Sequence, residues 1–255
     1  MASDRTLPSS APKQAVFLVG GLGTRLGELT RATPKPLVEV AGRPFLDWLV
    51  DETLRQGVRD VVLLSGYRAS QIETAMARLA DRGIKLTHSV EPEPLGTAGA
   101  LAYAREHLAE DFLLLNGDSL FRVDLADLIR PGAPDALVRL SLRQEADAGR
   151  YGSVQLQGER VTGFAEKLVS ETPTPGLING GVYWMRREVV EALQPGPSSL
   201  ERDVLPALVA AGRVEGRVYD APFIDIGVPE SLALAQTYVP EALQAKPLQP
   251  NRAND

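Results

Sequence analysis

The chain has 255 residues and a formal net charge of −6, from 33 acidic and 27 basic residues. This balance argues against a nucleic-acid or membrane-surface partner held by bulk electrostatics, so a phosphate ligand would have to be met by local basic residues. The absence of cysteine excludes disulfides, thiolate nucleophiles and cysteine metal sites. Residues 1–14 lack the apolar core of a signal peptide, and no apolar run approaches the ~20 residues of a membrane span. We therefore expect a cytoplasmic protein with a flexible N-terminal tail.

The first half of the chain is predicted to alternate strands with helices. Short apolar runs predict strands at residues 15–19, 61–64, 84–89 and 112–115. Amphipathic stretches predict helices at residues 45–56 and 71–82 and a third after Gly96, and Ser70 with Glu73 forms a predicted capping box for the second of these. This alternation predicts a parallel sheet covered on both faces, with ligands at the carboxyl ends of the strands.

The second half is predicted to be mainly antiparallel. Turn residues, without long helices, separate most of the strands predicted at residues 136–140, 154–156, 161–164 and 177–184. We expect these strands to form a lid or an acceptor-binding face. Farther on, Ser198 and Glu201 are predicted to cap a helix, residues 223–226 to form a last strand, and Pro229 to begin the closing helix. The fold class is α/β, with a single domain at residues 14–239 and a frayed tail at residues 240–255.

Residues 18–36, LVGGLGTRLGELTRATPKP, carry the strongest chemical signal in the chain. Glycines allow backbone conformations that bring several N–H groups to bear on one anion, which predicts a phosphate cradle. The glycines concerned are Gly20, Gly21 and Gly23. Arg25 and Lys35 add positive charge beside them. The anion is therefore expected to be larger than one phosphate, as the tail of a nucleoside triphosphate is.

Other interpretations of this loop stand beside the phosphate cradle. Gly21, Gly23 and Gly27 approximate a dinucleotide-binding fingerprint, and Glu39 lies near the distance of a ribose-binding acid, but the third glycine is out of register. A Walker loop would need Gly-Lys-Ser or Gly-Lys-Thr, which does not follow. The glycines could also form a merely structural turn. The nearby positive charges of Arg25 and Lys35 favour phosphate binding over a structural turn.

Two aspartates directly follow or end predicted strands, Asp118 in LLLNGD and Asp225 in FIDIG. Two such carboxylates facing a triphosphate suit Mg²⁺, which takes few protein ligands and leaves its other positions to water and phosphate oxygens. Either aspartate alone could simply cap a turn. Together with the glycine loop, they predict a metal site.

Three further features of the sequence could carry chemistry. Glu166 and Lys167 place an acid beside a base, for which a solvated surface pair is the ordinary interpretation. Asn179 precedes two glycines inside an apolar strand, and such glycines usually mark the close approach of a ligand or another backbone. His88 and His107 have no companions at the spacing of a metal site or a triad, so both are interpreted as structural.

The motifs GGLGTRL with TPKP, EPLGTAGAL, LNGDS, GFAEK, NGGVYWM and FIDIG follow one another over residues 14–238. In this order they resemble the sugar-1-phosphate nucleotidyltransferases. The compact chain and the motif SLERD before FIDIGVPE resemble most the D-glycero-D-manno-heptose 1-phosphate guanylyltransferases. Mannose-1-phosphate guanylyltransferases and the short uridylyltransferases acting on N-acetylmuramate 1-phosphate are similar enough to stay open. The resemblance implies a Rossmann-like mixed sheet with helices on both faces and small antiparallel additions that bind the acceptor.

The resemblance also implies substrates, a cofactor and site residues. The partners would be a nucleoside triphosphate and a sugar 1-phosphate, with Mg²⁺ as cofactor, no nucleic acid, and a homodimer as one option. Nucleotide binding would fall to Gly20, Gly21, Gly23, Thr24, Arg25, Lys35, Glu91, Pro94, Gly96 and Thr97. Sugar-phosphate binding would fall to Asn116, Gly152, Glu166, Lys167 and Asn179. Asp118 and Asp225 would hold the metal, and with Arg25, Lys35 and Lys167 they would form the catalytic set.

Such a transfer needs no protein nucleophile. The sugar 1-phosphate is already anionic and can attack the α-phosphorus directly, so the protein supplies positioning and charge stabilisation. A non-catalytic sugar-nucleotide sensor would be expected to lose one of the five catalytic residues, and all five are present. A nicotinamide-dependent oxidoreductase is a third interpretation, which the broken fingerprint and the two aspartates disfavour.

The resemblance implies that Glu91 lies against the edge of the nucleotide base. An ionised carboxylate only accepts hydrogen bonds, and the Watson–Crick edge of guanine presents two adjacent donors, so GTP is predicted as the donor substrate. The alternatives are a merely solvated Glu91 at the start of a proline-rich turn, or a base chosen by backbone groups at residues 95–97.

Overall fold

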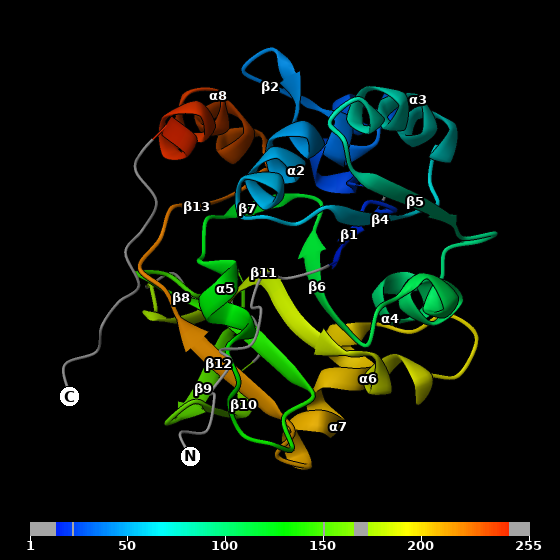
Figure 1. The fold of residues 1–255 in the computed structure, drawn as a ribbon. Helices are drawn as coiled ribbons and strands as arrows, with labels where there is room; N and C mark the ends of the chain where they lie inside the picture. The colour runs from blue at the N-terminus through cyan, green and yellow to red at the C-terminus, as the bar shows by residue number, and fades with distance from the viewer. Residues whose placement is uncertain (1–13, 22, 150, 166–172, 245–255) are drawn as a thin grey trace, which may run out of the picture.

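The computed structural model describes residues 14–21, 23–149, 151–165 and 173–244. Its centre is one nine-stranded mixed sheet with the order β5-β4-β1-β6-β11-β8-β12-β10-β9 (Figure 1). The first four of these strands are parallel, as predicted. They are β1 (Gln14–Leu18), β4 (Asp60–Ser65), β5 (Lys85–Val90) and β6 (Asp111–Asn116).

The strands of the second half continue the same sheet. β11 (Gly176–Arg186) runs antiparallel to β6 and to β8 (Val138–Glu145), and β12 (Val214–Val218) lies parallel to β8. β10 (Arg160–Ala165) and β9 (Ser153–Gln157) form the antiparallel edge. The predicted antiparallel strands are therefore present, and they extend the main sheet instead of standing apart from it. β12 was not predicted.

Helices cover both faces of the sheet, because successive side chains of a strand point to opposite faces. Ala15 and Phe17 of β1 pack into one apolar cluster, and Val16 packs into another. The first cluster is covered by α2 (Phe45–Arg55), α3 (Ala69–Ala80), α5 (Leu125–Ile129) and α8 (Pro229–Gln244). The second is covered by α4 (Gly96–Tyr103), α6 (Arg187–Glu191) and α7 (Leu205–Ala210). Within the described ranges, every helix is too short or too polar to cross a lipid bilayer.

Several short elements lie outside the main sheet. The predicted last strand forms as β13 (Phe223–Asp225), but it pairs with β7 (Ser119–Phe121) in a separate two-stranded sheet. β2 (Glu39–Val40) and β3 (Arg43–Pro44) make a second small sheet. Short helical segments complete the description: η1 (Thr24–Leu26), α1 (Glu28–Ala32), η2 (Lys35–Leu37), η3 (Arg105–His107) and the π-helical η4 (Leu200–Val204).

Three predicted helix boundaries are wrong. α3 has Arg68 at its N-cap, in the left-handed conformation and without a side-chain cap, so the predicted capping box at Ser70 does not form. Ser199, one residue after the predicted Ser198, caps η4 by accepting a hydrogen bond from the Arg202 N–H. α8 begins at Pro229 as predicted but continues through Pro240 to Gln244, where a frayed tail was expected.

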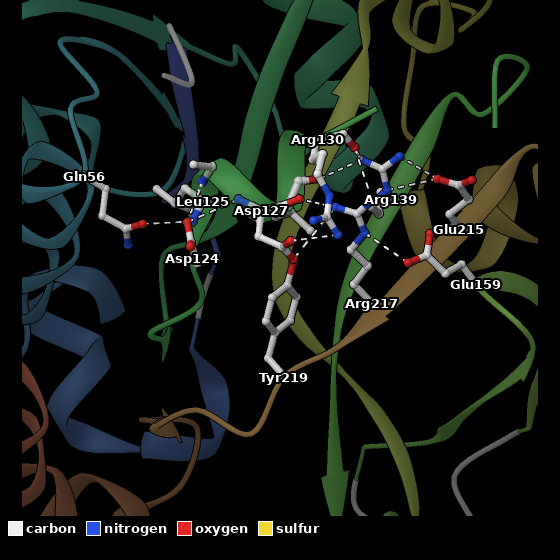
Figure 2. A network of polar contacts seen from close by, with 12 residues as sticks. Gln56, Asp124, Leu125, Asp127, Arg130, Arg139, Glu159, Glu215, Arg217 and Tyr219 are labelled. Carbon is white, nitrogen blue, oxygen red and sulfur yellow. Dashed lines mark hydrogen bonds and ion pairs between the residues drawn. The ribbon is translucent and has the colours of Figure 1, made fainter. Parts of the chain in front are cut away.

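A buried ion pair joins β8 to β12 (Figure 2). The Arg139 side chain is only 1% exposed, and its Nη2 lies 2.6 Å from Glu215 Oε2. Arg139 Nη1 donates to the carbonyl oxygens of Leu128 and Arg130, both at 2.7 Å. The guanidinium thus ties the end of α5 to the second half of the sheet, with both buried charges paired and hydrogen-bonded.

Candidate active site

The glycine loop and the Asp118 segment meet at the carboxyl ends of β1 and β6. These strands are neighbours, with Leu18 opposite Asn116. The Gly117 N–H donates to the Leu18 carbonyl at 3.0 Å, and a Cβ at position 117 would lie 2.5 Å from that oxygen. Residue 117 must therefore be glycine to pass this close to β1, and the chain delivers Asp118 directly beside the glycine loop.

Lys35, Asp118 and Asp225 converge at this edge. Lys35 Nζ lies 2.6 Å from Asp118 Oδ2, and the lysine side chain is 12% exposed against 42% for the aspartate. The Ile226 N–H donates to the Asp118 carbonyl at 2.9 Å, which places the end of β13 alongside. A Cβ built at Gly227 would lie 2.6 Å from Asp225 Oδ1 and 3.5 Å from Lys35 Nζ. The structure thus brings together three of the predicted catalytic residues.

The Asp225 carboxylate is held by groups on both of its oxygens. The Tyr151 hydroxyl donates to Oδ2 at 2.5 Å, and the Gly227 N–H donates to Oδ1 at 2.8 Å. The Tyr151 ring packs edge-on against Phe223, with centroids 6.0 Å apart. No sequence motif pointed to Tyr151. Its neighbour Gly152, predicted to bind sugar hydroxyls, forms a turn whose N–H donates to the Ala148 carbonyl at 2.9 Å.

The carboxylates of Asp118 and Asp225 suit a divalent cation that takes only a few of its ligands from the protein. Two aspartates and one lysine leave a local excess of one negative charge. No cluster of three or more His, Cys, Asp or Glu side chains suited to a metal occurs in the part of the chain that the structure describes. A cation held by Asp118 and Asp225 would therefore complete its shell with phosphate oxygens and water, as Mg²⁺ does at phosphoryl-transfer sites.

The fold requires glycine at one position of the glycine loop and leaves empty space around another. Gly23 has φ +62°, and a Cβ there would lie 2.9 Å from Thr30 Cγ2 and 3.0 Å from Lys35 Cβ. A Cβ at the exposed Gly21 would meet nothing within 4 Å. Thr24 and Arg25 lie in η1, and Arg25 is exposed with no ionic partner among the described residues. The loop therefore presents open space and an unpaired cation on its outer side.

Gly21→Ala is expected to leave the free energy of unfolding unchanged or to raise it by about 0.4–1 kcal/mol, because alanine restricts the unfolded chain and clashes with nothing. The nucleotide KM should nevertheless rise at least tenfold, since phosphate oxygens would need that space. Urea unfolding and steady-state kinetics measure the two effects. Gly23→Ala is the matched control and should destabilise the fold. An unchanged nucleotide KM in Gly21→Ala would place the phosphates elsewhere.

The Glu91 carboxylate lies between the glycine loop and the end of β4. Its Oε2 accepts a hydrogen bond from the Leu95 N–H at 3.1 Å. Its Oε1 lies 3.3 Å from a Cβ position built at Gly20 and 2.4 Å from one built at Gly66. Burial raises the pKa of Glu91, and the Leu95 hydrogen bond partly opposes that rise. Sequence analysis missed Gly66, whose lack of a side chain makes room for this carboxylate.

Gly96 and Thr97, both predicted to bind nucleotide, contact the segment that leads into η4. A Cβ at Gly96 would lie 2.6 Å from the Ser198 carbonyl oxygen. Thr97 Oγ1 donates to Glu201 Oε2 at 2.9 Å and accepts from the Leu200 N–H at 2.7 Å. Pro94 is exposed on the preceding loop. The start of α4 is thus fixed to η4 by hydrogen bonds.

Asn116 ends β6, two residues before Asp118, and Asn179 lies on the neighbouring strand β11. Asn179 Nδ2 donates to the Tyr183 hydroxyl at 2.8 Å, and Asn179 Oδ1 accepts from the Gly181 N–H at 3.1 Å. A Cβ at Gly181 would lie 2.7 Å from Asn116 Nδ2. Burial, with the negative charges of Glu201 and Asp118, raises the pKa of the 1% exposed Tyr183. Tyr183 joins the polar groups of this edge, and sequence analysis missed it.

The paired glycines of β11 have a different role from the one predicted. A Cβ at Gly180 would lie 2.1 Å from the Phe121 ring, and Gly181 makes room for Asn116 and Ser119. Protein side chains occupy the space that was attributed to a ligand or another backbone. Glu166 and Lys167 lie outside the described residues.

His88 has neighbours that its sequence context did not indicate. Its Nε2 lies 2.6 Å from Ser65 Oγ, and its Nδ1 lies 4.0 Å from Glu73 Oε1. This order of groups looks like a triad, but Ser65 is only 2% exposed and cannot meet a substrate. Burial lowers the pKa of His88, so the ring is neutral near pH 7. The structural interpretation of His88 therefore stands.

Comparison with known proteins shows the family to which this chain belongs. The family model for nucleotidyl transferases matches residues 14–241, so the chain belongs to the nucleotidyl transferase family. Among its relatives are D-glycero-alpha-D-manno-heptose 1-phosphate guanylyltransferases. The one from Aneurinibacillus thermoaerophilus is 36% identical over 88% of this chain and 96% of its own. The one from Campylobacter jejuni is 33% identical over 85% and 96%.

Other comparisons agree with this placement. A mannose-1-phosphate guanylyltransferase of Mycobacterium tuberculosis is 37% identical over 85% of this chain, which spans 61% of that protein. HddC of Yersinia pseudotuberculosis, solved in complex with GMP-PN, superposes with a TM-score of 0.78 at 33% identity, over 88% of this chain and 98% of that one. The predicted family and fold class are therefore confirmed.

Proposed function

We propose that this protein transfers GMP from GTP to D-glycero-D-manno-heptose 1-phosphate, releasing pyrophosphate. The observation that carries the proposal is the convergence of Lys35, Asp118 and Asp225 beside the open glycine loop. The two heptose 1-phosphate guanylyltransferases, matched over nearly their whole length, support the choice of acceptor. HddC in complex with GMP-PN supports a guanine nucleotide. A cytoplasmic location and a homodimer stay predictions.

The reaction is an in-line displacement at the α-phosphorus. A phosphate oxygen of the sugar 1-phosphate forms the new P–O bond, the bond to the β-phosphate bridging oxygen breaks, and pyrophosphate leaves with that electron pair. Lys35 and Arg25 offset the charge on the triphosphate and on the departing pyrophosphate. Mg²⁺ bound by Asp118 and Asp225 would neutralise phosphate charge. The ion pair between Lys35 and Asp118 supports a shared role of these two residues at the phosphate groups.

Pyrophosphate release across a matrix of GTP, ATP, UTP and CTP with several sugar 1-phosphates tests the function. GTP with D-glycero-D-manno-heptose 1-phosphate should give the highest kcat/KM, and product mass should equal a GDP-sugar. A preference for mannose 1-phosphate would instead assign the activity of a mannose-1-phosphate guanylyltransferase, a class of enzyme to which the chain is also similar. No turnover with any pair would overturn the proposal.

Glu91→Gln is expected to reduce the preference for GTP over UTP by about tenfold to hundredfold, because an amide offers one acceptor where the carboxylate offers two. The kcat/KM values for both nucleotides measure this. Burial raises the pKa of Glu91, so the carboxylate takes up a proton at a higher pH than an ordinary glutamate. The wild-type preference should therefore weaken as the pH falls toward that pKa, and the Gln variant should lack this dependence.

A second variant moves the carboxylate without removing it. The Cβ of Gly66→Ala would lie 2.4 Å from Glu91 Oε1, so the side chain must shift and the preference for GTP should fall again. Glu93→Gln, an exposed acid on the same loop, is the matched control and should keep the wild-type preference. A nucleotide profile that neither Glu91→Gln nor Gly66→Ala alters would assign base choice to the backbone at residues 95–97.

A further inference from the structure

The short helix α1 connects the glycine loop to Lys35 and has little apolar packing of its own. The structure describes all five of its residues, and Thr30 is the one buried residue among them. The Thr30 hydroxyl donates to the Gly23 carbonyl at 2.9 Å. A Cβ at Gly23 would lie 2.9 Å from Thr30 Cγ2 and 3.0 Å from Lys35 Cβ. A shift of α1 would therefore move both the glycine loop and Lys35.

Three side chains from the start of α3 and the loop before it hold the last turn of α1. Arg68 Nη2 donates to the Arg31 carbonyl oxygen at 2.5 Å, and the Tyr67 hydroxyl donates to the same oxygen at 3.1 Å. Gln71 Nε2 donates to the Ala32 carbonyl at 2.9 Å. The last carbonyl groups of a helix have no partner within that helix. We call Tyr67, Arg68 and Gln71 the α1 clamp.

Arg68 contributes to the α1 clamp from an unfavourable backbone conformation. Its φ is +54°, in the left-handed region that disfavours every residue with a Cβ. Its exposed guanidinium lies over the Tyr67 ring at 5.3 Å, and its Nε donates to the Tyr67 hydroxyl at 3.0 Å. Stability of the backbone alone would favour glycine at position 68. Such strain points to a role for the side chain.

The loop that carries the α1 clamp also contacts Glu91. Gly66, directly before Tyr67, lacks the side chain that would collide with the Glu91 carboxylate. This loop therefore lies against the residue proposed to select the base and against the helix that follows the glycine loop. Both contacts belong to the nucleotide side of the site.

We infer that Arg68 is a positioning residue for nucleotide binding, which acts through α1 to fix the glycine loop and Lys35; this rests on the proposed function. The guanidinium donates to a backbone carbonyl, so Arg68 sets the place of α1 without contacting the nucleotide. Misplacement of a catalytic group by about 1 Å can reduce a rate by about a hundredfold.

Arg68→Ala in the purified full-length protein tests this inference. It should lower kcat/KM for GTP by about tenfold to hundredfold, while the acceptor KM changes by less than about twofold. Titration calorimetry with GTP and no acceptor should show a loss of affinity of about tenfold. Arg68→Lys keeps a charged donor and should recover most of both losses.

Two further variants separate positioning from stability. Arg59 is the matched control, because it is exposed and its Nη1 donates to the Leu54 and Val58 carbonyls at 2.6 and 2.7 Å, at the end of α2. Arg59→Ala removes a comparable contact away from the glycine loop and should keep wild-type GTP kinetics. Arg68→Gly relaxes the backbone, so it should unfold at a higher temperature than Arg68→Ala and yet show the same low kcat/KM.

Wild-type GTP affinity and kinetics in Arg68→Ala would overturn the inference. Recovery of the kinetics in Arg68→Gly together with its stability, or an equal kinetic loss in Arg59→Ala, would make Arg68 a merely structural residue and would also overturn it. The proposed function fails separately. If wild type turned over no sugar 1-phosphate but bound GTP with an affinity that falls in Arg68→Ala, the proposed function would be wrong and the role of Arg68 would stand.

Discussion

Replacement of Asp118 or Asp225 by asparagine is expected to lower kcat at least about a hundredfold, because each variant removes a negative charge from the proposed cation site at the reacting phosphates. The half-saturating Mg²⁺ concentration should rise in parallel. Asparagine has nearly the same shape as aspartate, so the fold should persist. Asp118→Asn also leaves Lys35 without its carboxylate partner, which should cause a modest loss of stability. Steady-state kinetics over a Mg²⁺ series and thermal unfolding measure the three effects.

Asp220→Asn provides the matched control, since this exposed aspartate precedes β13 and lies outside the cluster. It should keep wild-type kcat and Mg²⁺ dependence. Near-normal Mg²⁺-dependent turnover by folded Asp118→Asn or Asp225→Asn would exclude that residue as a metal ligand. A loss of turnover with unchanged Mg²⁺ dependence would instead assign it to positioning of Lys35 or Tyr151.

Glu215→Gln is expected to lower the free energy of unfolding by about 3–5 kcal/mol, because it leaves the buried Arg139 charge without its counter-ion (Figure 2). Domains are stable by about 5–15 kcal/mol, so this is a large share of the total. Urea unfolding followed by circular dichroism measures the change. The kinetic constants of the fraction that stays folded should change little, because the pair lies away from Asp118 and Asp225.

The exposed pair Arg31–Glu28 is the control for burial, with side chains 77% and 81% exposed. Glu28→Gln should change the free energy of unfolding by less than about 0.5 kcal/mol, since water already solvates both charges. The double variant Arg139→Met with Glu215→Leu removes both buried charges and should recover much of the stability lost in Glu215→Gln. A loss below 1 kcal/mol in Glu215→Gln would show that Arg139 is satisfied by backbone carbonyls alone.

Apolar periodicity predicted most of the fold, and its failures have a common physical cause. β1, β4 and β6 are buried on both faces and read as continuous apolar runs, so their positions were predictable. β12 was missed because Glu215 and Arg217 alternate along it, and both are buried. Their partners lie on distant parts of the chain, so local sequence gives no sign that these charges can be buried.

In the candidate site, too, local motifs were predictable and most contacts between distant segments were not. Loop motifs that follow strands were predictable, and the structure brings Lys35, Asp118 and Asp225 together. Tyr151 and Gly66 were missed, since each acts through a contact with a residue of a distant segment, Asp225 and Glu91 respectively. Tyr183 was missed too, although its partner Asn179 lies on the same strand. Ser199, and not the predicted Ser198, caps η4. The exact residue at which a helix begins depends on single hydrogen bonds, which the local sequence pattern does not fix.

β6 is shared by the two halves of the sheet, and this has a mechanical consequence. It pairs with β1, which precedes the glycine loop, and with β11, which carries Asn179. Neighbouring strands stand about 4.8 Å apart, and a hinge movement between these halves would break the backbone ladder that joins β6 to β11. We therefore expect the proposed nucleotide-binding and acceptor-binding regions to move as one rigid body, with the loops at the strand ends as the parts that can adjust during turnover.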